Sequence, residues 1–125
     1  MATPPALHEL ESRVMAAVWK QGEATVRSVA EAVAEAVERP RSYTTILTVM
    51  VRLDRKGFLE RRRVGKRDVY VAAIDQQEYA KARSEADVEA VLDEYGDLAL
   101  AHFARRFSEL EPSRQRALRR LARGE

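Results

Sequence analysis

The side chains best suited to chemistry are Thr45, Thr48 and Arg52, which recur at positions i, i+3 and i+7 within residues 42–57. On a helix with 3.6 residues per turn they lie along one stripe. Short hydroxyls followed by an arginine can approach base edges closely, and the guanidinium can bind guanine or phosphate. The alternative is a half-buried helix with neutral surface threonines, so the rest of the chain must supply the context.

Other kinds of chemistry find little support in the composition. The chain has no cysteine, which excludes disulfides, thiolate metal sites and thiol catalysis. Its two histidines, His8 and His102, are far apart, and no carboxylates show the spacing of zinc ligands. There is no phosphate-binding glycine loop and no nucleophile-elbow motif. We therefore predict no enzyme activity, no metal site and no cofactor.

Charge is segregated along the sequence, although the formal net charge is only +2. Residues 39–67 hold ten basic and two acidic side chains, a local net charge of +8, whereas residues 75–97 hold two basic and eight acidic ones, a net charge of −6. A basic block around the threonine stripe is the electrostatic footprint of a nucleic-acid-binding face, because each phosphate contact releases counterions. A solvated basic surface without a ligand is the alternative.

The length of the chain limits its architecture. With 125 residues and 46% hydrophobic content it can form one modest core and an appendage. It contains no apolar run long enough for a membrane span and no N-terminal signal segment. The expectation is a small soluble cytoplasmic protein without membrane insertion.

The elements that must position the threonine stripe begin with an amphipathic helix at residues 7–21, in which Met15 and Trp19 are expected core residues. Its boundaries are marked by prolines at positions 4 and 5 and by Gly22. A second helix follows, with Thr25 as its N-cap, a valine-rich inner face and its end at Arg39-Pro40.

The helix that carries the stripe is expected to start at the N-cap Ser42 and to stop at Gly57. Its inner stripe consists of Ile46, Val49, Met50 and Leu53. Three helices with short connections, the third basic and polar on its outer side, indicate a helix-turn-helix arrangement.

After Gly57 the pattern changes to two short strands around Gly65-Lys66, in which Val69, Tyr70 and Val71 can pack against the helices. The basic side chains near the tip are Arg63, Lys66 and Arg67. They suit the wing of a winged helix, which grips the sugar-phosphate backbone. Basic hairpin tips also protect sheet edges from aggregation, so the tip alone decides nothing.

Residues 75–125 are predicted as three further helices, one from Asp75, one after Gly96 and one opened by Pro112. So short a segment has few residues to cover its apolar side, which predicts a two-fold dimer that presents two recognition helices to two half-sites. Folding back onto the N-terminal part of the same chain is the alternative. The expected dimerisation residues are Val88, Val91, Leu92, Leu98, Leu100, Phe103, Phe107, Leu110, Leu118 and Leu121.

Three motifs together resemble a known family along nearly the whole chain. They are Glu9-Leu-Glu-x-x-Val-Met-x-x-x-Trp19 in the first helix, Tyr43-Thr-Thr-Ile-x-Thr-Val-x-x-Arg-Leu-x-x-Lys-Gly57 in the third helix and Gly65-Lys-Arg-x-Val-Tyr70 in the hairpin. The chain resembles the penicillinase and methicillin-resistance repressors, a family of bacterial winged-helix regulators. The related copper-responsive repressors carry a C-terminal cysteine cluster, which this chain lacks.

The resemblance implies a homodimeric transcriptional repressor that binds a palindromic operator and is released when a membrane sensor is triggered by a cell-wall antibiotic. In well-studied members release involves proteolysis at an Asn-Phe bond in the dimerisation region, and the matching position here is His102-Phe103. The alternative is that Phe103 is a dimer-core aromatic and His102 its polar neighbour.

We therefore predict a mainly α-helical fold with a small β-hairpin, divided into a winged-helix DNA-binding domain at residues 1–74 and a three-helix dimerisation domain at residues 75–125. The expected function is dimeric repression of β-lactam or cell-wall stress genes. The expected partners are double-stranded operator DNA, a second copy and, through the resemblance, a membrane sensor-protease or its effector pathway. A winged-helix protein-interaction module without specific DNA binding is the alternative. The residues expected to contact DNA are Arg41, Ser42, Thr44, Thr45, Thr48, Arg52, Arg63, Lys66 and Arg67.

Overall fold

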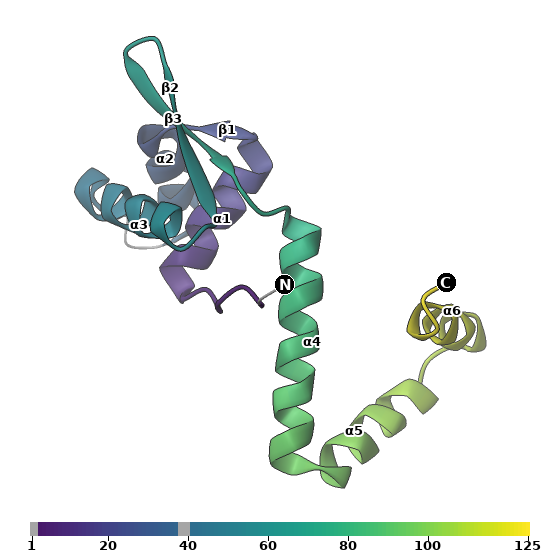
Figure 1. Ribbon diagram of the computed structural model, residues 1–125. Coiled ribbons are helices and arrows are strands. Elements are labelled where there is room, and N and C mark those ends of the chain that lie inside the picture. The colour runs from purple at the N-terminus through teal and green to yellow at the C-terminus, as the bar shows by residue number, and fades with distance from the viewer. Residues whose placement is uncertain (1–2, 38–40) are drawn as a thin grey trace. The chain divides into compact units, whose positions relative to one another are not determined.

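The computed structural model describes residues 3–37 and 41–125, and the chain forms two compact units, residues 1–83 and 84–125 (Figure 1). The first unit contains α1 (Glu9–Gln21), β1 (Glu23–Ala24), α2 (Val26–Ala36), α3 (Tyr43–Arg55), β2 (Leu59–Val64) and β3 (Arg67–Ala72). The chain continues through α4 (Gln76–Tyr95), α5 (Asp97–Ser108) and α6 (Pro112–Ala122). The predicted fold class, mainly helical with a small β-hairpin, is confirmed.

The first helix begins two residues later than the apolar pattern predicts. The backbone at His8 is extended, with φ −73° and ψ 167°, and the Leu7 N–H before it donates to the hydroxyl of Tyr79 at 3.2 Å. His8 is therefore the N-cap of α1, and the Glu11 side chain accepts a hydrogen bond from the His8 N–H at 2.9 Å.

The predicted caps of the next two helices are confirmed. Thr25 accepts a hydrogen bond from the Ser28 N–H at 3.0 Å and starts α2. That helix ends at Ala36, and the predicted end at Arg39-Pro40 involves residues outside the described part of the chain. Ser42 accepts from the Thr45 N–H at 3.2 Å and starts α3.

The predicted stop at Gly57 is also confirmed, through a Schellman motif. Gly57 has φ +88°, which costs glycine little because it lacks a Cβ. Its N–H donates to Asp54 O at 3.1 Å, while the N–H of the buried Phe58 donates to Leu53 O at 2.9 Å. The chain thus leaves α3 with its last carbonyls satisfied and turns directly into β2.

The sheet has three antiparallel strands in the order β1-β3-β2, one strand more than the sequence predicts. In the predicted hairpin, Arg61 faces Tyr70 and Arg63 faces Asp68 across the strands. The missed strand is β1, whose two residues, Glu23 and Ala24, pair with Val71 and Tyr70. So short a strand has no alternating pattern of its own and is recruited by the free edge of β3.

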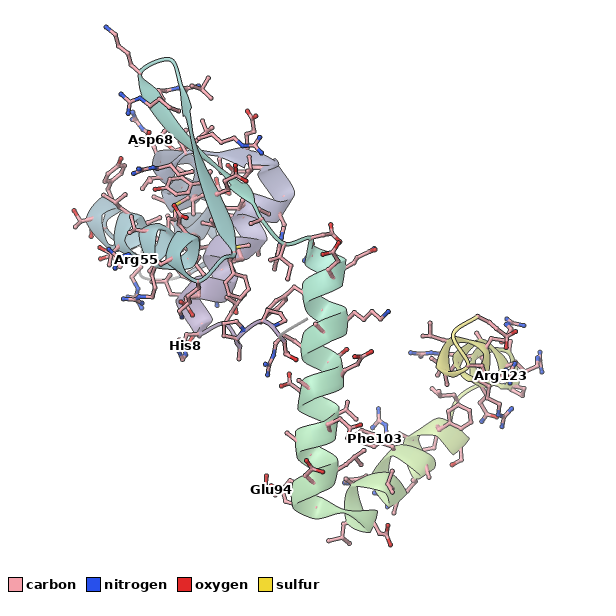
Figure 2. The ribbon with its side chains drawn as sticks, viewed as in Figure 1. His8, Arg55, Asp68, Glu94, Phe103 and Arg123 are labelled. Atoms are coloured by element: carbon pink, nitrogen blue, oxygen red, sulfur yellow. The ribbon has the colours of Figure 1, made fainter. Side chains whose placement is uncertain are left out.

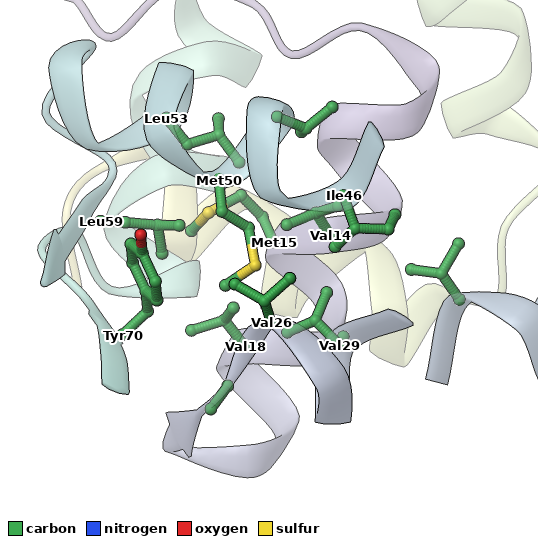
Figure 3. Close-up of a cluster of buried hydrophobic side chains, with 14 of the residues drawn as sticks. Val14, Met15, Val18, Val26, Val29, Ile46, Met50, Leu53, Leu59 and Tyr70 are labelled. Carbon is green, nitrogen blue, oxygen red and sulfur yellow. The ribbon is translucent and has the colours of Figure 1, made fainter. Parts of the chain in front are cut away.

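One hydrophobic core joins the three helices to the sheet (Figure 3). The inner stripe predicted for α3 is buried here, and Ile46, Met50 and Leu53 are fully buried. They pack with side chains of α1, α2 and the sheet, including Val14, Met15, Val18, Val29 and Tyr70. This core fixes which face of α3 turns outward.

The first compact unit extends beyond residue 74 and includes about two turns of α4. Tyr79 explains this extension, because its ring lies 5.8 Å from that of Trp19 and 5.6 Å from that of Phe58. The Trp19 indole N–H also donates to Ile74 O at 2.9 Å. Trp19 is thus half-buried, and it anchors the start of α4. The assignment of DNA binding and dimerisation to residues 1–74 and 75–125 stays a prediction.

In the second unit, α6 is attached to the end of α5 through Gln115. Its side-chain amide donates to Phe107 O at 2.9 Å and to Leu110 O at 3.2 Å. Pro112 occupies the first turn of α6, as predicted. None of the helices in the described part of the chain combines the length and the apolar character needed to cross a bilayer.

Candidate DNA interface

The outer face of α3 is formed by Thr44, Thr48, Val51, Arg52 and Arg55, of which Val51 is half-buried and the others are exposed. We call these five residues the α3 outer face. Because the opposite side of the helix is buried, this face is held in one orientation. It offers two hydroxyls, one apolar side chain and two guanidinium groups, a mixture suited to base edges and phosphates.

The hydroxyl groups of α3 differ in the hydrogen bonds that they can still form with a ligand. Thr48 Oγ1 donates its proton to Thr44 O at 2.9 Å, so its lone pairs remain free to accept from a base amino group. Thr45 is half-buried, and its Oγ1 lies 3.0 Å from Ser42 Oγ within the N-cap. The structure thus places Thr44 and Thr48 outward, while Ser42 and Thr45 contribute to the start of the helix.

The predicted stripe of Thr45, Thr48 and Arg52 lies slightly to one side of the α3 outer face. Arg52 and Thr48 line a shallow hollow of about 330 Å³ together with Leu47, Val51 and Arg55. Arg55 was missed by the sequence analysis, although the spacing i, i+4, i+7 and i+11 from Thr44 would have included it. Figure 2 labels Arg55 on α3 and Asp68 on the hairpin of the same unit.

The β2–β3 hairpin, called the wing below, carries exposed cations on both strands and on the turn. Gly65 has φ +63°, whereas no non-glycine residue in the described part of the chain has a positive φ, so the two-residue turn has the left-handed residue first, as in type II′. The Arg63 guanidinium lies 3.1 Å from the carboxylate of its cross-strand neighbour Asp68. Lys66 and Arg67 have no such ion pair within residues 3–37 and 41–125.

One hollow of about 630 Å³ brings the wing and the start of α3 together. It is lined by Tyr43 and Leu47 from α3 and by Arg63, Lys66 and Arg67 from the wing. Tyr70 forms part of its lining, and burial raises the pKa of its hydroxyl, with Arg61 acting in the opposite direction. The hydroxyl therefore stays protonated near neutral pH. Tyr43, which is 57% exposed, is a second residue that the sequence analysis did not select.

Arg41 lies apart from this hollow. It is exposed just before α3 and borders a different hollow, lined also by His8 and Arg13 of the α1 region and by Val37. Nine residues were expected to contact DNA. The α3 outer face includes three of them, Thr44, Thr48 and Arg52. The hollow between the wing and the start of α3 is lined by three more, Arg63, Lys66 and Arg67.

A buried ion pair fixes the C-terminal end of α3. Lys56 Nζ lies 2.8 Å from Glu11 Oε2, and Glu11 is only 2% exposed. Burial alone would raise the pKa of Glu11, but hydrogen bonds from Lys56 and from the His8 N–H, together with the charge of Lys56, hold the pKa below its usual value. The carboxylate is therefore charged at neutral pH and ties the first turn of α1 to the last turn of α3.

The second unit presents most of the predicted dimerisation residues at its surface. Val88, Val91, Leu98, Leu100, Phe103 and Leu121 are exposed, whereas Leu92, Phe107, Leu110 and Leu118 are half-buried. An apolar hollow of about 410 Å³ is lined by Val91, Leu98 and Phe103 and by two residues the sequence analysis did not select, Tyr95 and Ala99.

The candidate cleavage position, His102-Phe103, lies inside α5. Both side chains are exposed and both line the apolar hollow. His102 Nδ1 lies 2.9 Å from a terminal nitrogen of Arg105, one turn further along α5. The peptide bond itself is part of a continuous helix.

A three-helix core, a three-stranded sheet and a basic wing beside an outward polar helix define a winged helix, an architecture typical of DNA-binding transcriptional regulators. The model of the penicillinase repressor family matches residues 7–123. The chain belongs to this family of transcriptional repressors.

Two solved structures of the repressor BlaI are similar to this chain. One is the solution structure of monomeric BlaI of Bacillus licheniformis in complex with the blaP half-operator, and the other is the solution structure of the BlaI DNA-binding domain. Each is 29% identical in sequence, with a TM-score of 0.52, over 63% of this chain and 94% of the BlaI chain. Among curated proteins no match is found.

Proposed function

We propose that this protein is a homodimeric repressor that binds a palindromic operator and controls β-lactam or cell-wall stress genes. The observation that carries the proposal is the hollow in which Tyr43 and Leu47 of α3 meet the cations Arg63, Lys66 and Arg67 of the wing. One unit thereby offers a groove-reading helix and a backbone-gripping hairpin side by side.

Within this proposal the residues divide by task. Thr44, Thr48 and Arg52 read base edges in the major groove, whereas the half-buried Thr45, expected from its spacing to do the same, helps to hold the start of α3 through its contact with Ser42. Arg41 and Ser42 at the start of α3 and Arg63, Lys66 and Arg67 on the wing bind phosphate. The exposure of Thr44, Thr48, Arg52, Lys66 and Arg67 supports this division, as does the apolar hollow of the second unit for dimerisation.

The complex of monomeric BlaI with a half-operator supports one copy of this chain on each half of a two-part operator. A two-fold dimer would place two copies of α3 on half-sites separated by whole DNA turns. Release of such a dimer through a membrane sensor, with or without cleavage at His102-Phe103, belongs to the same proposal.

The experiment that tests the function is selection of bound fragments from genomic DNA, followed by sequencing. We expect enrichment of a palindrome upstream of a sensor gene or a β-lactamase gene. Enrichment of unrelated, asymmetric sequences would contradict the proposed operator.

A mobility-shift assay tests the alternative function. Absence of any shift with random DNA at low salt and about micromolar protein would favour a protein-interaction module, because non-specific binding falls in roughly that range.

Two alanine variants test the division of tasks. Thr48→Ala is expected to lower the discrimination between operator and random DNA, because it removes a base-edge acceptor. Lys66→Ala is expected to weaken both alike and to reduce the salt slope by about 1. Binding titrations across salt concentrations measure both effects, and unchanged values for both variants would show that the assignment is wrong.

A further inference from the structure

The last helix carries a cationic face that the proposed DNA interface does not use. Arg116, Arg119, Arg120 and Arg123 recur at i, i+3, i+4 and i+7, which places them along one side of α6, and all four are exposed. We call them the arginine stripe. No acidic residue occurs between positions 112 and 123 to neutralise it.

Only part of the arginine stripe is engaged within the chain. The guanidinium of Arg119 lies over the ring of Phe107 at 5.2 Å, and Arg123 pairs with Glu125 at 2.6 Å. Arg116 and Arg120 make no ion pair with any carboxylate in the described part of the chain. Both guanidinium groups are therefore available to a partner.

The second half of α4 carries the opposite charge. Residues 84–97 contain six acidic side chains and no basic one. Glu85, Glu89 and Asp93 recur at i, i+4 and i+8 beside the apolar side chains of this helix and form what we call the acidic flank. Like charges at this spacing repel one another and weaken a helix, so a cationic neighbour would stabilise α4.

The second unit also lacks a core of its own. Among residues 84–125, all of which the structure describes, Ala99 alone is buried, while Tyr95, Leu98, Leu100, Phe103 and Leu121 are 48–78% exposed. Apolar surface of this extent on so short a unit calls for a partner. Figure 2 marks the three helices concerned, with Glu94 on α4, Phe103 on α5 and Arg123 after α6.

We propose that the partner is a second copy of this chain, and that the arginine stripe of each copy lies along the acidic flank of the other. At 1.5 Å per residue the stripe spans about 10 Å and the flank about 12 Å, so the two match in length. A two-fold axis would repeat the contact, and the pairing would set the register in which the apolar surfaces meet. The inference rests on the proposed dimer and adds the charge pairing that sets its register.

Charge reversal in the full-length protein tests the proposal. A stripe variant, Arg116→Glu with Arg120→Glu, and a flank variant, Glu85→Arg with Glu89→Arg, are each expected to raise the dimer dissociation constant about tenfold or more at low salt. Sedimentation equilibrium measures it for each variant and for their mixture. An equimolar mixture is expected to form heterodimers about as tightly as the unmodified chain dimerises, because both contacts are then complementary.

The matched control for the stripe variant is Lys20→Glu with Arg27→Glu, which lowers the net charge of the chain by the same amount but changes residues of the first unit. This control is expected to dimerise like the unmodified chain. Recovery of tight dimerisation in the mixture of the stripe and flank variants also shows that each variant is folded.

The outcomes separate the inference from the proposed function. A stripe variant that dimerises normally would overturn the inference, and if it also bound random DNA less tightly, the stripe would be a phosphate contact. If both variants dimerised weakly and their mixture formed no tighter heterodimers, the inference would also be overturned, because the charges would then act within one chain. A monomeric unmodified protein would refute the dimer of the proposed function itself.

Discussion

Replacing Glu11 by glutamine isolates the contribution of the buried ion pair that ties α1 to the end of α3. Glutamine has nearly the same shape and keeps an oxygen that can accept from the His8 N–H. It removes the negative charge that faces Lys56 Nζ at 2.8 Å. The change is therefore electrostatic rather than steric.

The expected cost follows from burial and from the number of hydrogen bonds. Glu11 is 2% exposed and accepts two hydrogen bonds, and bonds to charged groups contribute about 1.5–3 kcal/mol each. Removing one member of a buried pair can cost more, but the Lys56 side chain is 30% exposed and its ammonium can return to water. We expect Glu11→Gln to lower the free energy of unfolding by about 2 kcal/mol, near the low end of these values.

Thermal unfolding at fixed protein concentration measures this loss, and about 2 kcal/mol corresponds to a Tm lower by roughly 8–16 °C for a unit of this size. The matched control is Glu9→Gln. Glu9 lies two residues away on the same helix and is 87% exposed, and its pair with Arg13 at 3.7 Å should contribute less than about 0.5 kcal/mol. Equal Tm values for Glu11→Gln and the unmodified chain, or equal losses in both variants, would refute the reasoning.

The pH dependence gives the same prediction a second test. The pKa of folded Glu11 lies below the ordinary value of 4.5, so its stabilisation is complete above that value and is lost as the pH falls through the folded pKa. The Tm difference between Glu11→Gln and the unmodified chain should therefore be constant from about pH 6 to pH 8 and shrink below pH 4.5. A difference that persists undiminished at pH 2–3 would show that the lost stability is not linked to this carboxylate.

Three further predictions concern single side chains. Asp68→Asn frees Arg63 from its ion pair at 3.1 Å, so it should tighten binding to all DNA sequences by about 2–5-fold and steepen the salt slope, as a filter-binding titration would show. Arg55→Ala should weaken operator binding by about 1–3 kcal/mol without changing the Tm, because Arg55 lies on the α3 outer face and is exposed. Tyr79→Phe should cost about 1 kcal/mol in denaturant unfolding, since it removes the acceptor of the Leu7 N–H at 3.2 Å; no loss would mean that water replaces the hydroxyl.

The sequence predicted local features whose cause is local. The caps Thr25 and Ser42, the stop at Gly57 and the turn at Gly65-Lys66 each depend on residues within a few positions, and all four are confirmed. The buried stripe of α3 was predicted for the same reason, since helical spacing alone decides which side chains share a face.

The features that the sequence did not predict depend on partners far along the chain. β1 exists because β3, more than forty residues later, offers it an edge. The Glu11–Lys56 pair joins residues 45 positions apart, and the hydrogen bond from Leu7 to Tyr79 spans 72. No periodic pattern in the sequence indicates such contacts, because each of these residues, taken alone, is of a type that is common at a surface or at a helix end.

The same distinction explains why the orientation of α3 was predicted only approximately. Spacing assigned Thr45 to the polar stripe, yet the angular boundary between the two faces depends on how deeply the helix sits between α1 and the sheet. The cap draws Thr45 toward Ser42 by a hydroxyl contact of 3.0 Å and leaves it half-buried, while Arg55 lies on the outer face one turn beyond Val51. The axis of the outer face therefore runs from Thr44 through Thr48 to Arg55, and a duplex bound there would meet hydroxyls at one end of α3 and two guanidinium groups at the other. Because the ammonium group of Lys56 is paired with Glu11 at 2.8 Å, those two arginines, rather than the lysine, supply the charge at that end.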